Sequence, residues 1–61
     1  MYKMTVDLSG EQRVFEFRGP ACHKKMLHAY HAHTENEEVE RICVWGTVAG
    51  RNEIVLEWTR E

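Results

Sequence analysis

Hydrophobic and polar residues alternate along most of this chain, and the alternation predicts two β-hairpins. In residues 2–8 the apolar positions are Tyr2, Met4, Val6 and Leu8, with polar residues between most of them. This period of two places the apolar side chains on one face of a strand. Ser9-Gly10 follows, and the glycine supplies the positive φ of a tight turn. Residues 13–18 resume the alternation with Phe15 and Phe17, so a first hairpin is expected over residues 2–18.

The second hairpin is expected over residues 41–59. Residues 41–49 read RICVWGTVA and are expected to form a strand whose two faces are both largely apolar. Gly50 and Asn52 provide the turn. In residues 53–59 the pattern predicts one face with Ile54, Leu56 and Trp58. The other face would carry Val55, Glu57 and Thr59.

Between the hairpins, residues 20–34 predict a single helix. Gly19-Pro20 ends the preceding strand, and proline is well suited to the first helical position because its missing N–H is not needed there. At 100° per residue, one side of the helix carries Cys22, Met26, Ala29 and Tyr30, which we expect to face the core. The opposite side carries Lys24, His28 and His31. The polar and acidic segment 34–40 is expected to form a helix end and a loop anchored by Val39, the alternative being a short second helical turn with Thr34 and Glu37 as a capping box.

These elements predict one small α+β domain over residues 1–61, with the order ββαββ. Its sheet would have four mainly antiparallel strands, and its helix would pack on one face. The alternation does not determine the order of the strands in the sheet. The expected core consists of Tyr2, Met4, Val6, Leu8, Phe15, Phe17, Ile42, Val44, Val48, Ile54, Leu56 and Trp58.

One helix covers only one face of such a sheet, so the other face must meet water or another protein. On that face we expect Val14, Cys43, Trp45 and Val55, with Trp45 and Val55 side by side on paired strands. Exposed apolar patches often mark interfaces, and tryptophan is enriched among the residues that contribute most to binding. The alternative is that Trp45 covers its own neighbours, or that a register slip of one residue exchanges the two faces.

The composition narrows the classes of function. A chain of 61 residues with 43% hydrophobic and 30% charged residues is typical of a small folded domain. Its formal net charge of −2 argues against a main role in wrapping nucleic acid, although Lys24, His28 and His31 form a modest basic row. We expect a cytoplasmic protein without a membrane span, because no long apolar segment occurs. Cys22 and Cys43 are then expected to be reduced, the alternative being one disulfide.

The histidines and cysteines do not complete a catalytic or metal site. His28 and His31 are three residues apart on the helix and could share a metal ion, but zinc sites use three or four protein ligands. His33 is expected to be a partly buried structural residue near the end of the helix. Cys22 lies about three helical turns from His33, so these two cannot act as nucleophile and base. We therefore expect no enzyme activity, no cofactor and no bound metal.

The sequence favours a small interaction or regulatory module of the accessory or inhibitor type, of the kind found on mobile elements. It is expected to form a homodimer through the face around Trp45 and to bind a further, unidentified protein. The alternative function is binding of nucleic acid or metal by the helix face with Lys24, His28 and His31. Nucleic acid is the less favoured partner because of the net negative charge.

Overall fold

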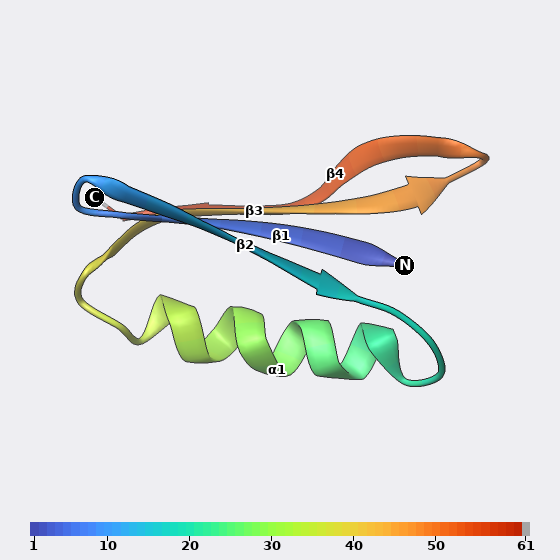
Figure 1. Ribbon diagram of the computed structural model, residues 1–61, viewed down its shortest axis with the longest axis horizontal. Helices are drawn as coiled ribbons and strands as arrows, with labels where there is room; N and C mark the ends of the chain where they lie inside the picture. Colours follow the sequence, from blue (N-terminus) through green and yellow to red (C-terminus); the bar gives the residue numbers. More distant parts are fainter. Residues whose placement is uncertain (61) are drawn as a thin grey trace.

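The computed structural model describes residues 1–60 and shows one sheet of four strands with one helix beneath it (Figure 1). The elements are β1 (Tyr2–Leu8), β2 (Glu11–Phe17), α1 (Cys22–Thr34), β3 (Val39–Val48) and β4 (Arg51–Thr59). The order ββαββ is the one expected from the alternating pattern. In space the strands lie in the order β2-β1-β3-β4, and all neighbours are antiparallel. The last residue of the expected domain, residue 61, lies outside the described part.

The core lies between α1 and the sheet. Six side chains are almost completely buried there: Met4, Val6, Met26, Val39, Ile42 and Val44. The strand residues among them come from β1 and β3, the two central strands, because only these strands have a neighbour on each side. Helix α1 packs against β1, β2 and β3. No helix within residues 1–60 has the length and hydrophobicity needed to cross a membrane.

Helix α1 begins at Cys22, two residues after the expected start at Pro20. Gly19 and Ala21 have φ angles of 81° and 64°, in the left-handed region. A residue with this φ cannot belong to a right-handed helix, so the positive φ of Ala21 sets the first helical residue at Cys22. Pro20 therefore lies in the connection between β2 and α1.

A β-bulge in β4 changes which residues reach the core. Val44 pairs with Leu56, but the next residue, Trp45, pairs with Ile54, so Val55 is the extra residue of the bulge. Ile54 is therefore opposite Trp45 and 46% exposed, and its predicted place in the core is wrong. Val48 was also expected in the core but is exposed. It is the last residue of β3, in the part of the β3–β4 hairpin that extends beyond the helix in Figure 1.

Arg60 attaches the end of the chain to the loop between α1 and β3. Its Nε donates to the carbonyl oxygen of Val39 at 2.9 Å, and its Nη2 donates to those of Asn36 at 2.7 Å and Thr34 at 3.4 Å. Thr34 is the last residue of α1, where carbonyl groups lack partners within the helix. The guanidinium carbon also lies 5.0 Å from the centre of the Trp58 ring. One side chain thus binds three carbonyls between the end of α1 and the start of β3, and it contacts Trp58, which packs against the core.

Replacing Arg60 with alanine should lower the free energy of unfolding by about 1–3 kcal/mol, because carbonyl groups of the loop lose a charged donor. Urea denaturation followed by circular dichroism measures this effect. Arg51→Ala is the matched control, since Arg51 is an exposed arginine at the other end of β4. Equal stability of the two variants would contradict a stabilising role for the Arg60 contacts.

Candidate interaction surface

The face of the sheet opposite α1 is defined by the strand register. Directly opposed residues of antiparallel strands share a face, so each register row gives neighbouring side chains. From β2 to β4, the first row is Gln12, Asp7, Arg41 and Thr59, the second is Val14, Thr5, Cys43 and Glu57, and the third is Glu16, Lys3, Trp45 and Ile54. We call these three rows the open face.

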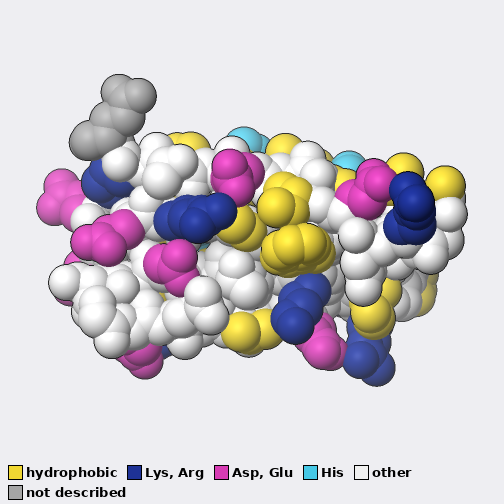
Figure 2. All heavy atoms as spheres, turned by 90° about the horizontal axis from the view of Figure 1, so that it is seen from above, with side chains coloured by type: hydrophobic (Ala, Val, Ile, Leu, Met, Phe, Trp, Pro, Cys, Tyr) yellow, Lys and Arg dark blue, Asp and Glu magenta, His cyan; other side chains and the backbone are white. Residues whose placement is uncertain are grey.

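The third row of the open face carries an exposed apolar pair, Trp45 and Ile54, beside charged side chains. Trp45 is 37% exposed and Ile54 46%, and they are directly paired between β3 and β4. Figure 2, which shows this side of the molecule, has hydrophobic side chains in the middle and both Lys/Arg and Asp/Glu side chains around them. An open groove runs beside Trp45 and is lined by Met1, Lys3, Thr5, Trp45 and Asn52. The exposed indole thus borders a groove.

Three of the four expected interface residues lie on the open face, and the fourth does not. Val14, Cys43 and Trp45 belong to its rows, with Val14 exposed at the β2 edge. A Cβ atom on Gly46 would lie 3.0 Å from Cε1 of Tyr2 and 3.3 Å from Cγ1 of Val55. Val55 and Tyr2 therefore flank Gly46 on the same side.

That side is the one covered by the helix. The Tyr2 hydroxyl oxygen lies 3.0 Å from Nδ1 of His23, a residue of α1. The expected neighbour of Trp45, Val55, is consequently replaced by Ile54. The run Ile54-Val55-Leu56 carries a signal for this change, because three consecutive apolar residues cannot all face one side of a regular strand. The contact between Tyr2 and His23 has no signal in the alternating pattern.

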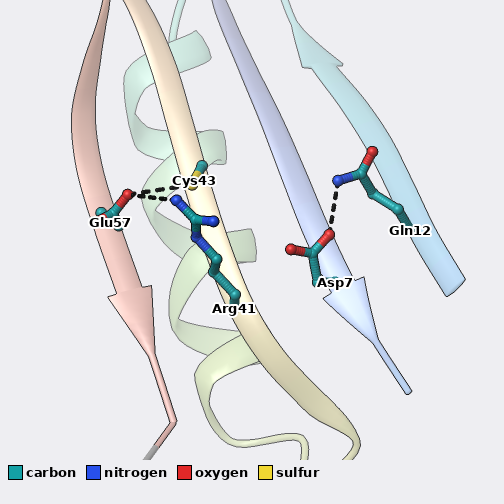
Figure 3. A network of polar contacts seen from close by, with 5 residues as sticks. All are labelled: Asp7, Gln12, Arg41, Cys43 and Glu57. Atoms are coloured by element: carbon teal, nitrogen blue, oxygen red, sulfur yellow. Dashed lines mark hydrogen bonds and ion pairs between the residues drawn. The ribbon is translucent and has the colours of Figure 1, made fainter. Parts of the chain in front are cut away.

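Arg41, Cys43 and Glu57 form a polar cluster on the open face (Figure 3). Nη2 of Arg41 lies 3.0 Å from Oε2 of Glu57, and Sγ of Cys43 donates to the same oxygen at 3.5 Å. The hydrogen bond from Arg41 lowers the pKa of the Glu57 carboxyl. Burial, and then the hydrogen bond to Glu57, raise the pKa of the Cys43 thiol. Although Cys43 belongs to the open face, it is only 7% exposed and remains a protonated, weakly nucleophilic thiol at neutral pH.

The other charged groups of the open face differ in how they are paired. Nε2 of Gln12 donates to Oδ1 of Asp7 at 2.7 Å, as Figure 3 shows. Glu16 accepts from Arg18, which lies just beyond the end of β2. Among residues 1–60 the ion pairs are Arg13 with Glu11, Arg18 with Glu16, and Arg41 with Glu57. Lys3 belongs to none of them.

The outer side of α1 is a separate surface. Lys24, His28 and His31 are all exposed, as the helical period predicted. No acidic residue occurs between Cys22 and Thr34. Within the described part of the chain, no group of three or more His, Cys, Asp or Glu residues is close enough to hold a metal ion.

His33 is half-buried, and its ring centre lies 5.3 Å from that of Phe15 on β2. Cys22 and Cys43 are both free thiols. Acidic residues gather elsewhere, where Glu11, Glu37, Glu38 and Glu40 line a groove together with Arg13 and Arg60. These groups therefore do not join the open face in a single site.

No family model, curated protein or solved structure matches the chain.

The pH dependence of stability should reveal the ion pair between Arg41 and Glu57. Because Arg41 lowers the pKa of Glu57 in the folded protein, the pair contributes stability above the unfolded pKa of about 4.3. That contribution is lost as the pH falls through the lower folded pKa. Glu57→Gln should therefore be less stable than the wild type at pH 7, with a smaller difference at pH 3, in urea denaturation. Glu53→Gln is the control, and an unchanged difference at both pH values for Glu57→Gln would contradict the pairing.

Thiol labelling tests the environment of Cys43. In a Cys22→Ser background, a disulfide reagent such as 5,5′-dithiobis(2-nitrobenzoate) should modify Cys43 slowly at pH 8. Adding Glu57→Gln removes a carboxylate that raises the Cys43 pKa, so more thiolate forms and labelling should become severalfold faster. Asp7→Asn, a neutralised carboxylate in the next row of the open face, should leave the rate unchanged. Slower labelling in the Glu57 variant would contradict this prediction.

Proposed function

We propose that this protein is a small non-enzymatic interaction module that forms a homodimer through the open face of its sheet. The observation that carries the proposal is the exposed pair Trp45 and Ile54 on a sheet face that α1 does not cover. A tryptophan surrounded by polar side chains resembles the centre of an interface, where aromatic anchors contribute most of the binding energy.

The size of the molecule supports association. An interface of ordinary size buries about 800 Å² of each partner. This is less than a fifth of the 4508 Å² of accessible surface. The molecule measures 32 × 20 × 18 Å, so its broad side has dimensions suited to such a contact. A domain of about 60 residues also has a small core, and binding of a second folded copy would stabilise it by mass action.

In this proposal the dimer acts as a regulatory or accessory protein that binds another protein. Stacking of the two sheets would leave each helix and each acidic loop on the outside. The exposed residues Glu37 and Glu38 of that loop favour a partner with a basic surface. We place the protein in the cytoplasm, where its two free thiols stay reduced.

The oligomeric state tests the proposal. Wild-type protein should sediment as a dimer over a concentration series at neutral pH. Trp45→Ser should weaken dimerisation about 30-fold, which corresponds to roughly 2 kcal/mol, the usual threshold for a residue that dominates an interface. Val48→Ser is the matched control, because Val48 is an exposed apolar residue of the same strand outside the open face.

Circular dichroism of each variant establishes that it is folded before its oligomeric state is compared. A wild-type protein that stays monomeric at millimolar concentration would overturn the proposal. Equal dimerisation of the Trp45 and Val48 variants would also overturn it, because the contact would then lie elsewhere.

A further inference from the structure

We propose that the two copies in the homodimer are related by a two-fold axis that lies midway between their stacked sheets. This axis runs perpendicular to the strands and passes over the paired residues Thr5 and Cys43. This inference rests on the proposed function, since it specifies the register of the homodimer. It uses the arrangement of charged and aromatic residues around that pair.

The two central strands carry matched residues on either side of this axis. On β1, Lys3 lies two residues before Thr5 and Asp7 lies two residues after it. On β3, Arg41 lies two residues before Cys43 and Trp45 lies two residues after it. The register between β1 and β3 is continuous over these positions, because its irregularity begins after Asp7. Rotation by 180° therefore places each Lys3 over the partner's Asp7. It also places each Trp45 over the partner's Arg41.

Both contacts are chemically complementary. Lys3 forms no ion pair within residues 1–60, and Oδ2 of Asp7 remains to accept a hydrogen bond when Oδ1 is held by Gln12. Arg41 is oriented by its hydrogen bond to Glu57, which engages the edge of the guanidinium and leaves its face to stack on an indole. Because the axis is two-fold, each contact occurs twice in the dimer.

The geometry of stacked sheets allows these contacts. Two residues along a strand span about 6.6 Å, and stacked sheets cross at about 30°. At that distance from the axis the crossing angle displaces opposed residues by roughly 3.4 Å, which is less than the strand spacing of about 4.8 Å. Each side chain therefore still faces the same strand of the partner. Stacked sheets lie about 10 Å apart. Long side chains such as lysine and tryptophan, which project from both sheets, can meet across this distance.

The outer strands distinguish this axis from a two-fold axis parallel to the strands. The parallel axis would keep a contact of opposite charge, with Asp7 over the partner's Arg41. It would, however, place exposed Val14 over the partner's Glu57, and Glu16 over the partner's Ile54. Both contacts would set a carboxylate against an apolar side chain. With the axis across the strands, Val14 meets the partner's Val14. Glu57 meets the partner's Glu57, but each carboxylate is paired with its own Arg41.

A charge exchange tests the register. Lys3→Asp and Asp7→Lys should each weaken homodimer formation at least about tenfold, because each creates two like-charge contacts in the dimer. An equimolar mixture of the two variants should associate with nearly wild-type affinity, since the heterodimer regains one Asp-Lys and one Lys-Asp contact. The double variant should likewise recover. Sedimentation velocity at low salt measures all four samples, and Lys24→Asp on the outer side of α1 is the control.

The possible results distinguish a wrong register of the dimer from the absence of the open-face dimer itself. Recovery in the mixture is expected only if residue 3 of one copy faces residue 7 of the other. The mixture and the double variant could associate as weakly as the single variants, while the wild type dimerises and its Trp45→Ser variant does not. That result would overturn this register but leave the open-face dimer standing. A monomeric wild type would overturn both. Circular dichroism of each variant, together with the mixture of two separately purified chains, excludes misfolding as the cause of weak association.

Discussion

A helix of 13 residues can cover only one face of a four-stranded sheet, and most features of this protein depend on that constraint. The side chains of β1 and β3 that meet α1 are almost completely buried, whereas those pointing the other way must be covered by neighbours on the sheet itself. Cys43 shows how this works, because it is 7% exposed although no helix lies over it. The adjacent polar side chains Arg41 and Glu57 contact each other and shield the thiol. Trp45 is too large for such covering and stays partly exposed.

The connections of the chain hold this arrangement together from both ends. Ala21, with its left-handed φ, determines where α1 begins, and Arg60 binds the loop after it. The loop carbonyls are therefore satisfied by a residue that follows the last strand rather than by one near them in sequence. This long-range contact joins the end of β4 to the end of α1.

Much of the fold follows from local patterns. The period of two in β1 and the glycine turns predicted the hairpins, and the helical period predicted Lys24, His28 and His31 as the exposed row of α1. It also predicted a core-facing side with Cys22, Met26, Ala29 and Tyr30, of which Met26 is buried and the other three are half-buried. The order of the strands did not follow, because any pairing of the two hairpins satisfies the same alternation. The place of Ile54 was predicted wrongly, since a bulge depends on the competition between adjacent apolar residues for two faces. The contacts of Arg60 lie outside local patterns altogether, because they join residues more than 20 positions apart.

The bulge at Val55 also bears on the size that an assembly of this protein can reach. Strands β2 and β4 are the two edges of the sheet, and a filament would grow if one edge of each copy paired with the opposite edge of the next. The extra residue interrupts the regular row of backbone donors and acceptors along β4, so this edge is a poor template for another strand. Unlimited growth requires two regular edges, and this sheet has one. Growth through the edges is therefore disfavoured by a single inserted residue.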